Sequence, residues 1–235
     1  MNGTIIQKNA LDLSRVSAVL FDFDGTLMDT NDLIRHTWRY TVKSLTGREM
    51  TDDEIRLSLG EMLMDTVRRV MPEVDAEHAV TFYRDYQRGI YLDRIKLFEG
   101  AEDVLLALRA AGYRTALVTS RLKGSTERGL IHFGIYNLFD AVLTASDTDV
   151  FKPDPAPINI ILERLGAGPD EAVYIGDAKQ DIEAGIAAGV ITVLVDWSLA
   201  LPPEKRAECP APDIIIKSLQ EILILLGVRD AEEIS

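Results

Sequence analysis

The segment Val19-Leu20-Phe21-Asp22-Phe23-Asp24-Gly25-Thr26 carries more information than any other part of this chain. Its first residues are apolar and β-favouring, and they predict a buried strand. Because side chains alternate along a strand, Asp22 and Asp24 are expected to point the same way at its carboxyl end. Two adjacent like charges are costly unless a cation lies between them or one carboxylate is protonated. An Asp-Gly turn explains Asp24 and Gly25, but not an aspartate set between two phenylalanines in an apolar run.

From residue 98 onward, β-favouring segments alternate with helical segments. Strands are expected at residues 115–119, 141–143, 172–175 and 191–195, and a last apolar triplet lies at 214–216. Strands that alternate with helices of this length predict a parallel sheet covered on both faces. The strand that ends near Asp22 belongs to that sheet. The predicted fold class is therefore α/β, a doubly wound parallel sheet.

Residues from about 29 to 95 have helical periodicity and contain no strand of quality. Thr51-Asp52-Asp53-Glu54 has the form of a capping box, so a helix is expected to start near residue 52. Gly47, Gly60 and Pro72 mark expected helix ends, and a fourth helix is expected over about 75–87. We therefore predict an α/β core formed by residues 1–27 and 98–235, with residues 28–97 as an inserted helical domain. Residues 201–212 are rich in proline and are expected to form a long loop.

The composition narrows the classes of partner. The 235 residues carry a net charge of −13, which argues against nucleic acid or an anionic membrane as a partner. An anionic substrate would need a bound cation or a well-placed Lys or Arg to offset the repulsion. The one cysteine, Cys209, excludes an internal disulfide and favours a reducing compartment. With no secretory pattern and no apolar run near the roughly 18 residues of a membrane span, a cytoplasmic protein is expected.

Polar side chains follow four of the predicted strands where each strand ends. In open parallel sheets, ligands bind outside the carboxyl ends of the strands. Each of these residues alone is commonly a cap, a turn residue or a solvated side chain, but their joint occurrence at one edge is much less expected by chance. The residues are Asp22, Asp24, Thr119, Ser120, Lys152, Asp177 and Asp181.

Four segments of the core combine into a recognisable pattern: Asp22-x-Asp24-Gly25-Thr26, Thr119 after an apolar strand, Lys152-Pro153, and Gly176-Asp177-x-x-x-Asp181. This combination resembles the haloacid dehalogenase superfamily of phosphohydrolases and covers the core from end to end. The helical insertion matches that superfamily's helical cap in position and character. Within the superfamily, the chain looks most similar to the branch of phosphoglycolate phosphatases and pyrophosphatases.

The resemblance implies a phosphatase that cleaves a small phosphorylated metabolite through an aspartyl-phosphate. It implies that Asp22 is the nucleophile, that Asp24 is the general acid and base, and that Lys152 neutralises the nucleophile and the phosphoryl oxygens. The substrate phosphate would be held by hydrogen-bond donors at three positions: Gly25, Thr119 and Ser120.

The resemblance also implies a Mg²⁺ cofactor, because an acidic site made only of oxygen ligands suits this hard cation. The implied ligands are the carboxylates of Asp22 and Asp177 and the backbone carbonyl oxygen of Asp24. Asp181 would be a further ligand, direct or through water, or would orient Lys152. The cap would close over the site and choose the substrate. The sequence leaves open the roles of Glu61, Arg68, Arg69 and Trp197.

Several alternatives stay open at the level of the sequence. A sugar phosphomutase of the same superfamily would keep all these residues, although Thr26 favours hydrolysis. A dehalogenase would lack the second acid, Asp24. A phospho-accepting signalling module uses similar groups without turnover, but such modules have about half this length and no helical insertion, and a catalytically inactive binding protein ranks lower. The natural substrate is open, and so is the choice between a monomer and a homodimer.

Overall fold

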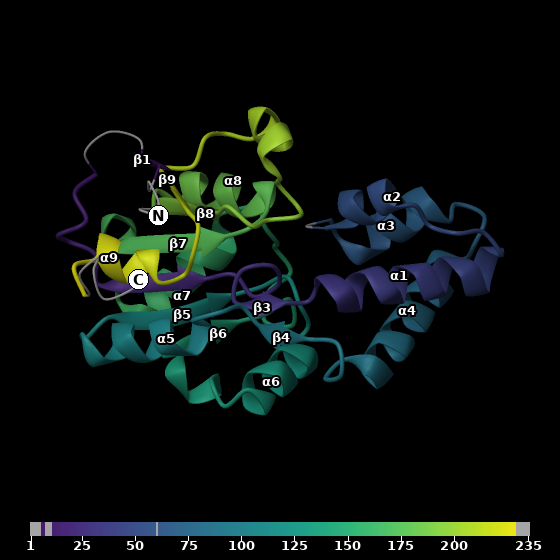
Figure 1. Cartoon of the computed structure of the whole chain (residues 1–235), viewed down its shortest axis with the longest axis horizontal. Coiled ribbons are helices and arrows are strands. Elements are labelled where there is room, and N and C mark those ends of the chain that lie inside the picture. The colour runs from purple at the N-terminus through teal and green to yellow at the C-terminus, as the bar shows by residue number, and fades with distance from the viewer. Residues whose placement is uncertain (1–5, 8–10, 60, 229–235) are drawn as a thin grey trace. The chain divides into compact units, whose positions relative to one another are not determined.

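The computed structural model describes residues 6–7, 11–59 and 61–228. The chain divides into two compact units (Figure 1). One comprises Met1–Met28 and Leu97–Ser235, and we call it the core unit. The other comprises Asp29–Lys96, and we call it the helical unit.

The core unit is built on one large sheet. Its strands are β1 (Ile6–Gln7), β2 (Ala18–Phe21), β5 (Arg114–Val118), β6 (Ala141–Leu143), β7 (Ala172–Gly176), β8 (Ile191–Val195) and β9 (Ile214–Ile216). The order across the sheet is β1-β9-β8-β7-β2-β5-β6. The strands from β9 to β6 are parallel to one another, and β1 is antiparallel to β9. The predicted α/β fold with a parallel sheet is confirmed, and β2 lies between β7 and β5.

Two details of the sheet differ from the expectation. The sequence pattern does not predict β1, because a two-residue edge strand is too short to show alternation. The strand β2 ends at Phe21, so Asp22 and Asp24 lie in the loop that follows it and not on one face of a strand. The chain turns there because the carbonyl oxygen of Phe23 accepts hydrogen bonds from the backbone amides of Leu27 and Met28, at 3.2 and 2.8 Å.

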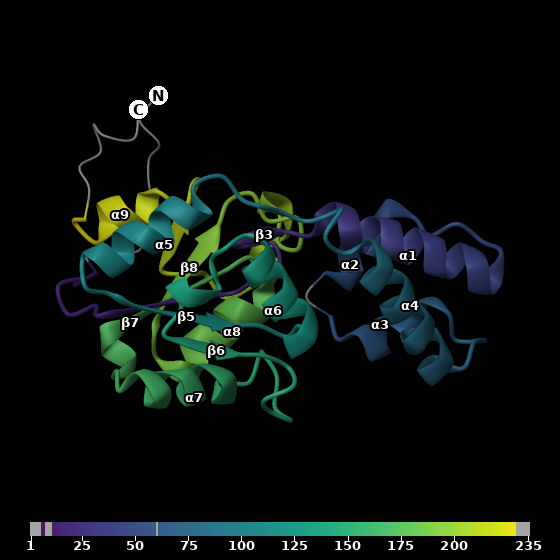
Figure 2. The same ribbon diagram turned by 90° about the horizontal axis from the view of Figure 1, so that it is seen from below.

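Helices cover both faces of this sheet (Figure 2). On one face α5 (Ala101–Ala110) contacts β5 and α9 (Glu221–Leu225). On the other face α7 (Ala156–Leu165) and α8 (Lys179–Ala188) pack on β5, β6, β7 and β8. The side chains buried between these helices and the sheet include Leu20, Val118, Leu143, Ile158, Ile161 and Tyr174. The helix α6 (Lys123–His132) follows β5.

The segment expected to be a long loop contains a short helix. Residues 203–208 form the 3-10 helix η3 (Pro203–Glu208), so the prediction of a long loop over 201–212 is wrong for these six residues. Proline is well suited to the first position of a helix, because its φ is already fixed and it has no amide hydrogen to leave unpaired. Two further 3-10 turns are η1 (Tyr136–Leu138) and η2 (Pro169–Glu171).

The helical unit contains α1 (Asn31–Thr46), α2 (Asp52–Ser58), α3 (Leu63–Val70) and α4 (Ala76–Ile90). The predicted capping box is present: the Thr51 hydroxyl accepts from the Glu54 amide, and the Glu54 carboxylate accepts from the Thr51 amide. Gly47 ends α1 in the left-handed conformation, as the sequence predicts. Gly60, predicted to end the second helix, lies outside the described residues.

The fourth helix is longer than predicted, since α4 runs through Gly89 to Ile90. A glycine inside a helix costs only about 1 kcal/mol, and the buried side chain of Tyr91 just beyond it anchors this end. The core of the unit packs around Trp38, whose ring lies 4.6 Å from that of Tyr83 between centroids. The chain enters and leaves the unit through the short pair β3 (Met28–Asp29) and β4 (Lys96–Leu97).

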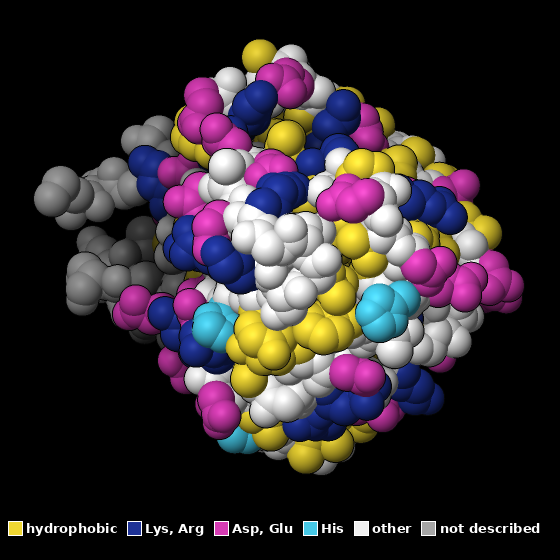
Figure 3. Space-filling model, turned by 90° about the vertical axis from the view of Figure 1, so that its right-hand side faces the viewer, with side chains coloured by type: hydrophobic (Ala, Val, Ile, Leu, Met, Phe, Trp, Pro, Cys, Tyr) yellow, Lys and Arg dark blue, Asp and Glu magenta, His cyan; other side chains and the backbone are white. Residues whose placement is uncertain are grey.

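Charged side chains of the helical unit are largely paired with one another. Arg69 lies 2.6 Å from Glu61, and Arg68 lies 3.7 Å from Asp65. Figure 3 shows acidic and basic side chains interspersed with hydrophobic ones over one face of the molecule. Exposed ion pairs of this kind contribute at most about 1 kcal/mol each. The pairing gives Arg68 and Arg69 carboxylate partners within their own unit.

Candidate active site

The site is assembled at the carboxyl end of the central strands. Since β2 pairs in parallel with both β5 and β7, Phe21 lies opposite Leu117 on one side and Ile175 on the other. The backbone amide of Asp22 continues the ladder one residue further and donates to the carbonyl oxygen of Ile175 at 2.8 Å. The loops that follow these three strands therefore start side by side, although the strands end far apart in the sequence, at Phe21, Val118 and Gly176.

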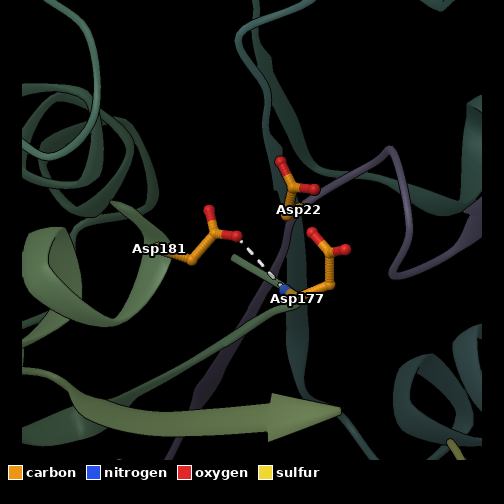
Figure 4. Close-up of side chains that lie close together, drawn as sticks. All are labelled: Asp22, Asp177 and Asp181. Atoms are coloured by element: carbon orange, nitrogen blue, oxygen red, sulfur yellow. Dashed lines mark hydrogen bonds between the residues drawn. The ribbon is translucent and has the colours of Figure 1, made fainter. Parts of the chain in front are cut away.

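Three buried carboxylates gather there: Asp22, Asp177 and Asp181 (Figure 4). One carboxylate oxygen from each lies within 4.8 Å of the others. Asp181 reaches back from the first turn of α8, and its Oδ2 accepts from the backbone amides of Asp177 and Ala178 at 3.2 and 2.9 Å. These bonds cap the helix and fix the Asp181 side chain towards the other two. We call this group the acidic cluster.

Burial disfavours the charged forms of the carboxyl groups in the acidic cluster. It raises the pKa of Asp22 to about 7, against the opposing pull of Lys152. Burial, together with the nearby charges of Asp181 and Asp22, also raises the pKa of Asp177 well above its usual range. A carboxylate with a raised pKa binds a proton readily, and it also gains most from a cation that replaces the proton.

Lys152 supplies one positive charge to the acidic cluster. Its Nζ lies 2.6 Å from Asp22 Oδ1 and 2.6 Å from Asp181 Oδ1, and its side chain is buried. Burial by itself lowers the pKa of this ammonium, but the carboxylates of Asp181 and Asp22 outweigh it and raise the pKa well above its usual value. Lys152 therefore stays charged and holds Asp22 and Asp181 in fixed positions.

Tyr174 is a member of this network that sequence reasoning misses. Its buried hydroxyl lies 2.9 Å from Asp181 Oδ1 and 3.0 Å from Lys152 Nζ. Burial raises the pKa of Tyr174 well above its usual value, so the phenol keeps its proton. In the sequence it lies within an apolar strand, where a tyrosine is normally interpreted as part of the hydrophobic core. Its position three residues before Asp177 is the feature of the sequence that could have indicated a role at the site.

The acidic cluster suits a divalent metal ion. One ammonium cannot balance three carboxylates, and among the described residues Asp177 forms no ion pair with a Lys or Arg side chain. An acidic site made only of oxygen atoms suits a hard divalent cation, and the three carboxylates offer one oxygen each within 4.8 Å of one another. Gly25 has φ +82°, and a Cβ added to it would overlap the Asp177 carboxylate, so the backbone approaches that carboxylate as only glycine allows.

The loop after β8 forms hydrogen bonds with the backbone on both sides of the acidic cluster, at Gly25 and at Asp177. The indole N–H of Trp197 donates to the carbonyl oxygen of Gly25 at 3.0 Å, and its ring packs on Phe98. The hydroxyl of Ser198 donates to the carbonyl oxygen of Asp177. Trp197, whose role the sequence leaves open, thus contacts the backbone beside Asp24. Ser198, which sequence reasoning misses, supports the backbone of Asp177.

The remaining predicted site residues lie around the acidic cluster. The carboxylate of Asp24 is not part of the acidic cluster and forms an ion pair with Arg121. Nothing in the sequence indicates that Arg121 belongs to the site. Thr119 is buried, and its hydroxyl accepts from the backbone amide of Arg121 at 3.1 Å. Ser120 is exposed. The carboxylates of Asp22 and Asp24 contact different cations, Lys152 and Arg121.

Comparison with known proteins defines the class. Residues 19–195 match the family model described as haloacid dehalogenase-like hydrolase. Pyrophosphatase PpaX of Bacillus velezensis is 31% identical over 92% of this chain and 98% of that protein. Pyrophosphatase PpaX of Listeria innocua is 34% identical over 93% of this chain and 99% of that protein. The chain therefore belongs to the haloacid dehalogenase-like hydrolases, and the prediction of a phosphatase of this superfamily is confirmed.

Solved structures have the same fold. The haloacid dehalogenase hydrolase of family IA, variant 3, from Entamoeba histolytica superposes with a TM-score of 0.80 at 22% identity, covering 91% of this chain and 98% of that one. A structure described as a predicted phosphoglycolate phosphatase from Haemophilus somnus superposes with a TM-score of 0.77 at 21% identity, covering 91% of this chain and 99% of that one.

Among the helices of the described residues, none is long and apolar enough to cross a bilayer.

Metal binding to the acidic cluster should depend strongly on pH. Because burial raises the pKa of Asp22 to about 7 and also raises that of Asp177 well above its usual range, protons compete with the metal near neutrality. A folded-state carboxyl pKa above the unfolded value of 3.8 also means that the metal-free fold loses stability as pH rises through 7. Added Mg²⁺ should therefore raise the melting temperature more at pH 8 than at pH 6. Thermal unfolding with and without Mg²⁺ at the two pH values measures this, and an equal shift at both would contradict it.

Proposed function

We propose that this protein is a Mg²⁺-dependent phosphatase that cleaves a small phosphorylated metabolite through an aspartyl-phosphate on Asp22. The observation that carries the proposal is the contact between Asp22 and Lys152 inside the acidic cluster. A buried carboxylate that touches an ammonium and lies beside Asp177 has the charge and position needed to attack an anionic phosphoryl group. Phosphoryl transfer depends mainly on positioning and on charge neutralisation.

In the first step an oxygen of Asp22 forms a bond to phosphorus while the bond from phosphorus to the leaving oxygen breaks. Asp24 gives its proton to that leaving oxygen. Lys152 stays in contact with Asp22, and its positive charge stabilises the negative charge that develops on the phosphoryl oxygens. Thr119, Ser120 and the amide of Gly25 are proposed to donate hydrogen bonds to the same oxygens.

In the second step water attacks phosphorus and gives a proton to Asp24. The bond between Asp22 and phosphorus breaks, which frees inorganic phosphate and restores the Asp22 carboxylate. Asp181 and the Tyr174 hydroxyl hold Lys152 in place throughout. When bound between Asp22 and Asp177, with the Asp24 carbonyl oxygen as a further ligand, Mg²⁺ would neutralise charge on the phosphoryl group.

The helical unit, Asp29–Lys96, is proposed to act as the cap that covers the site during transfer and selects the substrate. Phosphoglycolate and pyrophosphate are the first substrates to consider, because relatives covering most of the chain are named pyrophosphatases and a structural neighbour is described as a phosphoglycolate phosphatase. Those names favour hydrolysis over isomerisation of a sugar phosphate. The enzyme family also favours turnover over a signalling role.

A substrate panel tests the proposal. The purified chain is incubated with phosphoglycolate, pyrophosphate and several sugar phosphates, with Mg²⁺ or with EDTA, and released phosphate is measured. We expect release from at least one small substrate with Mg²⁺ and loss of at least about 100-fold with EDTA. Acid quenching during turnover should trap phosphate on the protein. Isomerised sugar phosphate without net release would favour the mutase, and no metal-dependent reaction would refute the proposal.

A further inference from the structure

Arg121 forms a two-pronged ion pair with the Asp24 carboxylate. Its Nη2 lies 2.8 Å from Asp24 Oδ1, and its Nε lies 2.9 Å from Asp24 Oδ2. A planar guanidinium that donates to both carboxylate oxygens fixes the plane of the carboxylate as well as its position. The contact therefore sets the orientation of Asp24.

The two partners differ in their exposure. The Arg121 side chain is 8% exposed and the Asp24 side chain is 29% exposed. The guanidinium also lies over the ring of Phe23, 5.9 Å from its centroid. The Asp24 carboxylate is therefore more accessible to solvent than the guanidinium that holds it. Arg121 is placed to act through Asp24.

The backbone of Arg121 is fixed independently of its side chain. Its amide donates to the hydroxyl of Thr119 at 3.1 Å, and its carbonyl oxygen accepts from the amide of Ala145 at 2.9 Å. The first bond lies within the loop that follows β5, and the second joins that loop to the one that follows β6. A side chain that starts from such a fixed point loses little further freedom when it forms the ion pair.

Two cationic side chains among the described residues contact different carboxylates of the site. Lys152 contacts Asp22 and Asp181 in the acidic cluster, whereas Arg121 contacts Asp24 outside it. If Arg121 served only to offset the net negative charge, pairing with the acidic cluster would achieve more, because three carboxylates lie there. Its place beside Asp24 points to a role specific to that carboxyl group.

We propose that Arg121 is a positioning residue for Asp24. It holds the carboxyl group in the orientation from which a proton passes to the leaving oxygen and a later proton is taken from water. The inference rests on the proposed function, in which Asp24 carries out both transfers. It extends that function by assigning the residue that aims the acid and base.

The test compares two substrates of similar size, benzyl phosphate and p-nitrophenyl phosphate, with the full chain and Mg²⁺. The benzyl alkoxide needs a proton to leave, whereas p-nitrophenolate leaves as a stable anion. General acid catalysis contributes about 10²–10⁴-fold. For Arg121→Lys, which keeps the charge but loses the two-pronged geometry, we expect kcat to fall about 100-fold on benzyl phosphate and less than about threefold on p-nitrophenyl phosphate.

The ratio of the two rates is the decisive readout, because a fraction of misfolded enzyme lowers both rates equally and leaves their ratio unchanged. In an Asp24→Asn background, Arg121→Lys should change the benzyl phosphate rate by less than about twofold, since a residue that acts through Asp24 has nothing left to position. Arg109→Lys is the matched control, because Arg109 also pairs with an aspartate of the core unit, Asp140 at 2.8 Å, away from the site. It should change neither rate.

Equal losses on both substrates, or a full additional loss in the Asp24→Asn background, would overturn the inference while leaving the phosphatase in place. Arg121→Gln, which keeps a planar donor without charge, gives a second reading and should show the same selective loss. If the wild type releases phosphate from neither these substrates nor the metabolite panel, the proposed function fails first and the inference fails with it.

Discussion

Replacing Asp22 by Asn is expected to lower kcat by at least about 10⁴-fold, because the amide cannot form the bond to phosphorus. Protein folding should be preserved. Burial raises the pKa of Asp22 to about 7, so the charged carboxylate destabilises the folded state at neutral pH. A neutral side chain of the same shape removes that destabilisation. Asp181 still partners Lys152 in the variant. We therefore expect a melting temperature equal to or above that of the wild type.

Phosphate release and thermal unfolding measured on the same preparation check both parts. Asp103→Asn, an exposed carboxylate on α5, serves as the control and should leave both quantities unchanged. Trapping of phosphate on the protein should disappear in Asp22→Asn and persist in Asp103→Asn. More than a tenth of wild-type activity in Asp22→Asn would rule out a nucleophilic Asp22.

Lys152→Met is expected to damage stability as well as activity. The change leaves the carboxylates of Asp22 and Asp181 buried without their ammonium, and breaking a buried pair from one side costs about 3–5 kcal/mol. The loss in the free energy of unfolding should be smaller at pH 5 than at pH 8, because the Asp22 carboxyl group, whose pKa is raised to about 7, takes up a proton at the lower pH and no longer needs a cation. We expect kcat to fall by about 10³-fold in the folded fraction.

Denaturant unfolding at the two pH values measures the stability, and phosphate release measures the activity. The control is Lys179→Met on α8, which removes an ammonium from an ion pair with Glu183 at 3.6 Å that is 47% exposed on the lysine side. Solvent screens that pair, so its removal should cost at most about 1 kcal/mol at either pH. A cost for Lys152→Met as small as that for Lys179→Met would mean that Lys152 does not stabilise the acidic cluster.

Much of the architecture follows from the sequence because its causes are local. Alternating strand and helix periods predict the parallel sheet, and the rule that ligands bind at the carboxyl ends of strands selects Asp22, Lys152, Asp177 and Asp181 as neighbours. The structure brings these four side chains into contact or close approach. The capping box at Thr51 is equally local, and it is present where predicted.

The sequence does not reveal features that depend on contacts between residues far apart in the chain. Arg121 is unremarkable in a loop, and only the neighbouring strand shows that Asp24 is its partner. Tyr174 resembles an ordinary core residue until α8 places Asp181 beside its hydroxyl. Ser198 resembles an ordinary loop residue until the fold places its hydroxyl beside the carbonyl oxygen of Asp177. The pairing of β1 with β9 joins segments about two hundred residues apart, and two residues of strand carry no pattern that would predict it.

The hydrogen bonds from Trp197 and Ser198 bear on how the protein is made. A ribosome delivers Asp22 early, Asp177 much later, and the loop that braces both later still. Until that loop emerges and β8 joins the sheet, the early aspartates have no rigid frame in which to bind a metal ion. The nascent chain should therefore remain without phosphatase activity through most of its synthesis, and a chain cut just before β8 should contain every motif of the family and still be inactive.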